Sequence, residues 1–424
     1  MEVHDLNVVH AASLAQVHDS GAVRRGATQG DLDIITDGAV AIRDGQIVAV
    51  GSTAEVLATR GTDNVPTIDA RGKCVLPGLV ECHSHPLFAG ERHHEYAERL
   101  GGATLAEVAA RGGGIWSSVV ATRGASDVEL LARLSTTLQR IMAGGVTTLE
   151  VKSGYGLTVD DELRGLELLQ RARSMTPMQL AITFLGAHVV PRDLDGDAET
   201  RRSRYTDLIG SDMLSAVVAQ GIAEFQDVTV EENYFTPEQG LHLMRRSHES
   251  GLPVRVHADA WASSQGWVTA VEGGAVSAEH LTYTPDDEIR DVGCTDTVAV
   301  VLPMAELVYM TSRRANARLF IETEVPVAIA TDFCSSIRAT SLLTTAAVAA
   351  PWFRMTPGEV IVGVTLNAAY SLGCHSMCGS LDVGKRGDLI ILDCSHPDEV
   401  FLAVGAPLLD QVVIAGGVVL GEQP

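Results

Sequence analysis

Eight short runs of apolar, β-prone residues alternate with longer stretches rich in alanine and leucine between residues 75 and 373. Such alternation predicts β/α units around a parallel sheet. The number of runs matches a (β/α)8 TIM-type barrel, an α/β fold that takes about 250 residues. The runs span residues 75–80, 146–151, 180–185, 225–230, 254–257, 276–280, 297–302 and 327–331.

The stretches between the runs predict helices, two of them at residues 128–142 and 161–174. In the first, Leu130, Leu134 and Leu138 recur at the spacing of one apolar helical face. Hydrophobic residues make up 46% of the chain and aromatic ones only 4%. We therefore expect a barrel core built mainly from Ala, Val, Leu and Ile side chains.

Both ends of the chain show a different pattern, in which strands are joined by tight turns. Residues 39–42 and 46–50 flank Asp44-Gly45, which is a strong signal for a β-hairpin. The same texture returns near the C-terminus in residues 388–392, 411–415 and 418–420. We predict a composite β-sandwich domain of residues 1–75 plus 375–424, next to a barrel of residues 76–374.

The composition narrows the range of partners. The formal net charge of −23 repels phosphate backbones and anionic membranes, which argues against both as partners. Seven cysteines without a repeated spacing predict reduced thiols and a cytoplasmic protein. Residues 1–20 lack the pattern of a signal peptide, and no apolar run reaches the roughly 18 residues of a membrane span.

Residues that bind metals stand at the ends of several predicted strands. His83 and His85 follow the first run, so on an extended strand end both side chains point to the same side. His257 ends the fifth run and Asp332 follows the eighth. Because the carboxyl ends of barrel strands open onto one face, we expect these side chains to surround one ion. Three imidazoles and a carboxylate suit a borderline divalent cation such as zinc.

Each of these residues also has a simpler interpretation. His83 and His85 alone are compatible with polar loop positions, and Asp332 with the N-cap of a following helix. Metal ligation is favoured because all of them occupy strand ends. His280, after the sixth run, and His188, after the third, are expected to ligate the metal, to contact a reacting carbonyl, or to be satisfied core residues.

Longer motifs surround these residues. The most specific is Lys152-Ser153-Gly154-Tyr155-Gly156 together with Gly186-Ala187-His188. Further segments are Pro77 to His85, Phe88 to Arg92, Gly112 to Ile115, Ala121 to Arg123, Gly145 to Thr148, His257 to Asp259, Ala330 to Phe333 and Gly379 to Leu389. Together these segments resemble the amidohydrolase superfamily and, within it, the imidazolonepropionase family of histidine degradation.

The resemblance implies a role for each candidate side chain. One divalent cation, zinc or iron, is implied to have four ligands: His83, His85, His257 and Asp332. His280 is implied to polarise the substrate carbonyl or to stabilise its oxyanion, and Asp332 to move the proton of the attacking water. Arg92, Tyr155 and His188 are implied to contact the substrate. A guanidinium fork suits a carboxylate, whereas the alternative for Arg92 is an exposed ion pair with Glu91 or Glu95.

Three departures from the family pattern cluster at strand ends. Ala260 stands where the family usually has Glu or Gln, three residues after the histidine of the fifth strand. The segment Cys334-Ser335-Ser336-Ile337 replaces an Asn-Pro-Gly-Ser loop that helps hold the substrate carboxylate. Met304 replaces a glycine and is expected to narrow or reshape the cavity. The cluster predicts a divergent relative acting on a modified ring, with drift among ordinary imidazolonepropionases as the alternative.

The favoured hypothesis is a metal-dependent hydrolase that opens a cyclic amide. The expected substrate is 4-imidazolone-5-propionate or a close analogue with an acidic side chain, opened by attack of a metal-activated hydroxide on the ring carbonyl. A heterocycle deaminase ranks lower, because such enzymes usually need the acidic residue that is absent at Ala260. A catalytically silent, ligand-binding member of the superfamily is the third hypothesis. A homodimer is expected from the resemblance alone.

Overall fold

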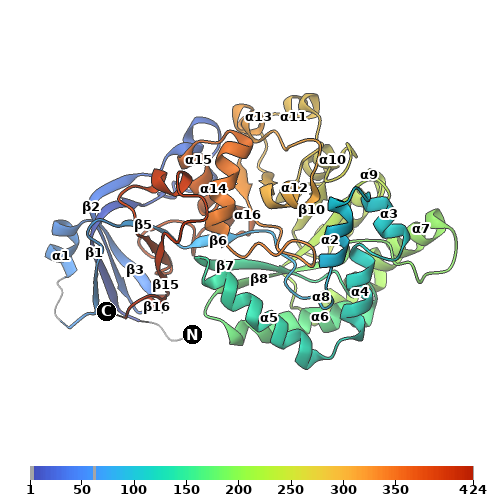
Figure 1. Ribbon diagram of the computed structural model, residues 1–424, viewed down its shortest axis with the longest axis horizontal. Coiled ribbons are helices and arrows are strands. Elements are labelled where there is room, and N and C mark those ends of the chain that lie inside the picture. The colour runs from blue at the N-terminus through green and yellow to red at the C-terminus, as the bar shows by residue number, and fades with distance from the viewer. Residues whose placement is uncertain (1–3, 61–63, 424) are drawn as a thin grey trace.

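The computed structural model describes residues 4–60 and 64–423, which form two eight-stranded sheets. One sheet collects strands from both ends of the chain, and the other is a barrel of parallel strands with helices around it (Figure 1). The α/β fold class with a TIM-type barrel is thereby confirmed. Within the described residues, no helix combines the length and the apolar character needed to cross a membrane.

The barrel strands follow one another in sequence order around the ring. They are β6 (Leu79–Glu81), β7 (Val146–Lys152), β8 (Gln179–Ala187), β9 (Phe225–Val230), β10 (Val254–Ala258), β11 (Ser277–His280), β12 (Val298–Val301) and β13 (Val327–Ile329). All eight predicted barrel strands are present, with ends that differ from the prediction by up to four residues.

The ring of strands is nearly closed. Seven neighbouring pairs, from β6 with β7 to β12 with β13, are parallel ladders. Between the first and the last strand, the contact is an isolated parallel bridge from Ser84 to Phe333. There the His85 backbone N–H donates to the Phe333 carbonyl at 2.7 Å. Closure therefore takes place just beyond the strand ends, next to the predicted metal ligands.

The second sheet joins the two ends of the chain, as the turn patterns predict. Its strands in spatial order are β16 (Gly417–Leu420), β15 (Leu409–Ile414), β14 (Leu389–Leu392), β5 (Cys74–Pro77), β1 (Leu6–Ala15), β2 (Ile34–Arg43) and β3 (Gln46–Ser52), with β4 (Thr67–Asp69) paired to β1. In the β2–β3 hairpin, Arg43 pairs with Gln46. Asp44 and Gly45 both have positive φ, 49° and 74°, which is the geometry of a type I′ turn.

One predicted strand is two strands. The run of residues 75–80 divides at Gly78: Pro77 pairs with Leu389 in the terminal sheet, and Leu79 pairs with Val146 in the barrel. A Cβ on Gly78 would lie 2.3 Å from the Thr147 Oγ1 atom, so only glycine lets the chain pass this close to β7. The apolar run is continuous in sequence because both halves are buried, although they belong to different sheets.

Helices surround the barrel, between and beyond its strands. They are α1 (Thr53–Arg60), α2 (His93–Leu100), α3 (Leu105–Ala110), α4 (Ile115–Gly124), α5 (Asp127–Met142), α6 (Val159–Ala172), α7 (Ala198–Leu208), α8 (Leu214–Gln220), α9 (Pro237–Glu249), α10 (Gly266–Glu272), α11 (Asp286–Val292), α12 (Pro303–Tyr309), α13 (Ala317–Glu322), α14 (Leu342–Phe353), α15 (Pro357–Gly363) and α16 (Leu366–Ser371). Of these, α1 belongs to the terminal sheet, where it packs against β2 and β3.

The two helices predicted in detail are present. In α5, Leu130, Leu134, Leu138 and Ile141 form the buried face, as their spacing predicts. Helix α6 begins two residues before the prediction, because the Thr158 hydroxyl caps its first turn by accepting from the Asp161 backbone N–H.

Candidate metal centre and substrate pocket

A cavity of about 520 Å³ lies at the carboxyl ends of the barrel strands. Active sites of TIM-type barrels lie on this face. Its lining includes every predicted site residue except His83, which lies behind His85 and His257. The side chains that line it are His85, Arg92, Ile115, Tyr155, His188, Thr229, Glu231, His257, Ala260, Trp261, His280, Tyr309, Asp332, Cys334 and Ser336.

The four predicted metal ligands meet at the base of this cavity. The Nε2 atom of His85 lies 3.3 Å from the Nε2 atoms of both His83 and His257. The Asp332 Oδ1 atom lies 3.5 Å from His83 Nε2 and 3.6 Å from His85 Nε2. His280 belongs to the same cluster, since one of its ring nitrogens lies within 4.8 Å of ligand atoms of His83 and Asp332.

The chemistry of this donor set fits a bound cation. Burial lowers the pKa of His83 and of His85 well below the usual value, so both rings present neutral nitrogen donors. Neutral imidazole nitrogens and a carboxylate oxygen packed this closely lack a shared hydrogen-bond pattern that satisfies all of them. A divalent cation among them would satisfy the whole set.

His257 is held from behind by a carboxylate. Its Nδ1 atom lies 3.0 Å from the Asp227 Oδ1 atom, and the other Asp227 oxygen accepts from Lys152 Nζ at 2.7 Å. Burial opposes the protonated form of His257, but the charge of Asp227 outweighs it and leaves the pKa raised. An imidazole that donates Nδ1–H to a carboxylate directs its Nε2 lone pair toward the ligand cluster.

A layer of buried charges continues below the site. Lys152 also donates to Glu150 at 2.7 Å, and the Arg255 guanidinium lies 3.0 Å from both Glu150 and Glu279. All of these side chains have 0% exposure. Besides the aliphatic side chains that the composition predicts, the barrel interior therefore contains charges of both signs that pair with one another.

Asp332 and His280 adopt unusual backbone conformations. Their φ angles are +54° and +75°, in the left-handed region that non-glycine residues rarely occupy. His280 is the last residue of β11, Asp332 lies three residues beyond β13, and both line the cavity. Burial raises the pKa of Asp332 to about 7, which brings its protonation equilibrium close to neutral pH.

His188 and Tyr155 form one wall of the cavity. The His188 Nδ1–H donates to the Gly154 carbonyl at 2.8 Å, and its ring stacks on His85 with 5.2 Å between centroids. Burial lowers the pKa of His188 to about 3. The Tyr155 hydroxyl lies 3.4 Å from the Ser335 hydroxyl. His188 is therefore held by backbone and does not belong to the ligand cluster.

Arg92 also lines the cavity, where it shares the Ser335 hydroxyl with Tyr155, and it is buried to 9% exposure. Its Nε atom donates to Glu95 at 2.8 Å and its Nη1 atom to the Ser335 hydroxyl at 3.2 Å. The ion pair with Glu95 considered above is real, but it is buried rather than exposed. It leaves the Nη2 nitrogen of the guanidinium free of any protein hydrogen bond in the described residues.

Two of the three unusual positions line the cavity. Ala260 forms part of its wall, and Cys334 and Ser336 from the replaced loop form another part. The expectation for Met304 is wrong, because Met304 is absent from the lining and packs against the apolar cluster that contains Val80. Met304 lies in the first turn of helix α12, which begins at Pro303.

Several pocket residues escape the sequence analysis. Glu231 lies at the end of β9, where its carboxylate accepts from the backbone N–H groups of Trp261 and Ala262 at 3.0 and 3.2 Å. Trp261 packs edge to face on Tyr309, with 4.6 Å between ring centroids. The sequence offers a signal for Asp227 alone, as an acidic residue inside a predicted strand, all of whose residues prove to be buried.

Comparison with known proteins agrees with the barrel fold described above. The chain matches the amidohydrolase family over residues 74–422. Its fold is similar to an adenosine deaminase from Xanthomonas campestris with bound zinc, at 18% identity and a TM-score of 0.69 over 99% of this chain and 93% of that chain. It is also similar to atrazine chlorohydrolase from Arthrobacter aurescens complexed with zinc, at 17% identity and a TM-score of 0.68 over 98% and 95%. The chain therefore belongs to the amidohydrolase family.

Residues 38–59 match the imidazolonepropionase-like composite domain of bacteria. The chain is 39% identical to the imidazolonepropionase of Symbiobacterium thermophilum, over 99% of this chain and 98% of that relative. It is 38% identical to the imidazolonepropionase of Geobacillus kaustophilus, over 92% of each. Within the amidohydrolases it belongs to the imidazolonepropionase family, whose members hydrolyse a C–N bond of a cyclic amide, and it is a hydrolase of this kind.

Proposed function

We propose that this protein opens the ring of 4-imidazolone-5-propionate, or of a close analogue with an acidic side chain, with one zinc or iron ion bound. The observation that carries the proposal is the meeting of His83, His85, His257 and Asp332 within 3.6 Å of one another along successive contacts. The substrate ring is proposed from the names of the relatives, which are imidazolonepropionases. A place in histidine degradation follows from that substrate.

The metal would be held by the three Nε2 atoms and the Asp332 carboxylate. When bound, a divalent cation lowers the pKa of water toward about 7 and polarises a carbonyl oxygen. Zinc is preferred because imidazole and carboxylate ligands suit it. Iron is the alternative, since imidazole ligands suit it as well.

Protein side chains would then accept and donate the protons of the reaction. The Asp332 carboxylate would accept a proton from the attacking water and return it to the ring nitrogen that leaves, because it lies next to the ligand nitrogens of His83 and His85. His280 is a neutral ring, since burial lowers its pKa well below the usual value. Its N–H can donate to the carbonyl oxygen as negative charge develops there.

The rest of the cavity orients the substrate. Arg92 offers its free nitrogen, with the Ser335 hydroxyl beside it, to the carboxylate of the side chain. Tyr155 and His188 contact the ring.

The two other hypotheses are less supported. A heterocycle deaminase shares the fold, yet the similarity to the deaminase of Xanthomonas campestris is only 18% in sequence. A catalytically silent member is disfavoured because all four candidate ligands are present and in contact. We further propose that the protein is cytoplasmic, in keeping with its unpaired cysteines, and that it is a homodimer, as the resemblance to the family implies.

The test is a metal analysis combined with a ring-opening assay. The purified protein is expected to hold about one metal ion per chain and to convert 4-imidazolone-5-propionate, with loss of ring absorbance and no release of ammonia. Asp332→Asn is expected to lower turnover by about 10²- to 10⁴-fold. Bound metal without turnover of this ring or of its sulfur- or nitrogen-substituted analogues refutes the proposal, and ammonia release favours deamination instead.

A further inference from the structure

The loop of residues 153–157 follows strand β7 and carries Tyr155 into the substrate cavity. Glu162, in the first turn of α6, has 0% exposure and holds this loop from its outer side. Its Oε1 atom accepts from the backbone N–H groups of Gly156 and Leu157 at 2.9 and 2.8 Å, and its Oε2 atom accepts from Gly154 at 3.1 Å. One buried carboxylate therefore accepts hydrogen bonds from three backbone N–H groups of the loop.

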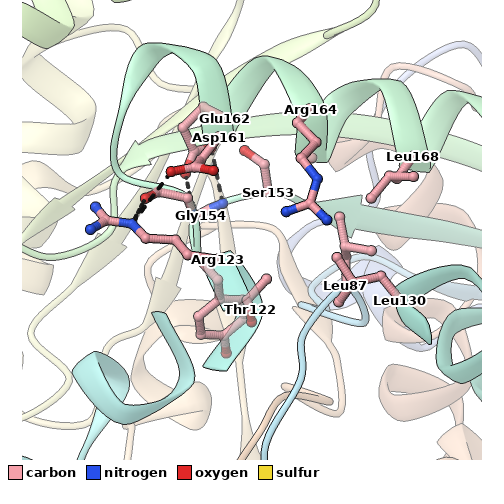
Figure 2. Close-up of a pocket in the computed structure, with 13 residues that line it drawn as sticks. Leu87, Thr122, Arg123, Leu130, Ser153, Gly154, Asp161, Glu162, Arg164 and Leu168 are labelled. Atoms are coloured by element: carbon pink, nitrogen blue, oxygen red, sulfur yellow. Dashed lines mark hydrogen bonds and ion pairs between the residues drawn. The ribbon is translucent and has the colours of Figure 1, made fainter. Parts of the chain in front are cut away.

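Arg123, near the end of α4, binds a backbone carbonyl of the same loop. Its Nε atom donates to the Gly156 carbonyl at 2.6 Å, while Nη1 donates to Asp193 at 2.6 Å. Figure 2 shows Glu162 and Arg123 converging on the loop backbone from different elements. We call these two side chains the loop clamp. The clamp lies outside the substrate cavity, and neither side chain lines it.

The clamped loop also determines the orientation of His188. Gly154 has φ of +104°, and a Cβ there would lie 2.9 Å from the Leu185 carbonyl and 3.1 Å from His188 Nδ1. This close approach lets the Gly154 carbonyl accept the Nδ1–H of His188 at 2.8 Å. The proton of the ring is thus held at Nδ1, and Nε2 is left as an acceptor on the side of the cavity.

We propose that Glu162 and Arg123 are positioning residues that hold His188 in its Nδ1-protonated form and Tyr155 in place. The cavity consequently presents a nitrogen lone pair at His188, so it selects heterocycles that carry a ring N–H donor at that point. This selection deepens the proposed function, because an imidazolone ring has such a donor. The orientation of His188, however, is a property of the protein alone and does not depend on which ring is turned over.

The first experiment reads the protonated nitrogen directly. Long-range ¹H–¹⁵N NMR spectra of histidine-labelled protein, with the His188 signals assigned by their loss in His188→Gln, are expected to show Nδ1–H and bare Nε2. In Glu162→Gln, the side-chain amide opposes one of the three backbone donors, and the His188 signals are expected to move toward a mixture of both forms. Unchanged His188 signals in this variant overturn the proposal.

The second experiment separates positioning from stability. Glu162→Gln is expected to raise KM for the ring substrate about tenfold, because a charge-assisted hydrogen bond is lost, with kcat reduced less. Glu167→Gln, on the exposed side of the same helix, is the matched control and is expected to leave KM unchanged. A variant that loses stability but keeps KM overturns the positioning role.

Arg123→Lys provides a second variant if Glu162→Gln folds poorly. Lysine keeps the positive charge beside Asp161 and Asp193 but does not reproduce both guanidinium hydrogen bonds. We expect the same direction of change in KM and in the His188 signals, with a smaller amplitude. If the native protein fails to open the ring, the proposed function is refuted, while the NMR result still decides whether the clamp orients His188.

Discussion

The Asp227 Oδ1 atom lies 3.0 Å from His257 Nδ1, on the far side of the imidazole from the nitrogen that faces His85. Two neighbouring strands, β9 and β10, supply this pair, and their register places Asp227 beside Arg255, two residues before the pair of Thr229 with His257. Asp227 in turn contacts Lys152 on β7. The orientation of one candidate ligand is therefore determined by charges on three strands.

Replacing Asp227 with Asn is expected to weaken metal binding. The amide cannot accept from both His257 and Lys152 with full charge, so His257 loses the partner that orients it. Loss of such a partner typically lowers metal affinity about 10- to 100-fold. The measurement is zinc affinity by competition with a chromophoric chelator. Asp207→Asn, an exposed position on α7, is the control, and equal affinity in both variants contradicts the prediction.

Arg92→Lys is expected to weaken binding of the acidic substrate while the fold persists. Lysine retains a positive charge beside buried Glu95, yet it lacks the planar fork that holds a carboxylate through two hydrogen bonds. We expect KM to rise about tenfold with little change in kcat. A substrate analogue without the carboxylate serves as the comparison. If KM for the two compounds responds equally, Arg92 does not recognise the acid.

Gly78→Ala tests the passage between the two sheets. The added methyl would meet the Thr147 side chain at 2.3 Å, so overpacking is expected to cost about 1–3 kcal/mol in the free energy of unfolding. Urea unfolding measures this loss. The second substitution Thr147→Ala is expected to restore part of it. At Gly124, a Cβ meets nothing within 4 Å, and Gly124→Ala is expected to be tolerated.

Glu306 provides a prediction about pH. Burial raises its pKa to about 7, although its carboxylate accepts from the Ala315 N–H at 2.8 Å and from Trp352 Nε1 at 2.6 Å. The folded pKa lies above the unfolded value of 4.5. The stabilisation is therefore complete below the unfolded pKa and is lost as pH rises through about 7.

The measurement compares the native protein with Glu306→Gln, which cannot ionise. Between about pH 5.5 and about pH 8.5, the stability of the native protein relative to the variant is expected to fall by about 2 kcal/mol. Glu322→Gln, at an exposed site, is expected to show no such dependence. A pH-independent difference between the native protein and Glu306→Gln contradicts the raised pKa.

Sequence patterns were sufficient for the barrel and for the group of four candidate ligands. Parallel barrel strands have their carboxyl ends on one face, so His83, His257 and Asp332 meet as soon as their strands are recognised. The division at Gly78 was not predictable in the same way, because a buried strand of either sheet has the same apolar pattern.

The surroundings of the ligands depend on geometry that residue spacing does not reveal. The pairing of Asp227 with His257 requires the register of β9 against β10, and the clamp of Glu162 requires the path of a loop. The error at Met304 has the same origin, because residue spacing does not reveal which side chains of the first turn of α12 line the cavity. Side-chain contacts between separate elements of the fold therefore could not be predicted from the sequence.

Ser84, between His83 and His85, contacts strand β7 on one side and Phe333, beyond β13, on the other. Its hydroxyl donates to the Glu150 backbone carbonyl at 2.5 Å, and its own carbonyl accepts from the Lys152 backbone N–H at 3.1 Å. It also forms the isolated bridge to Phe333. The tripeptide that brings two candidate metal ligands to the cluster therefore also closes the ring of strands. A chain in which this tripeptide is not yet in place lacks both the closed ring of strands and the grouped ligands. Ring closure and the capacity to bind a metal therefore arise together during folding.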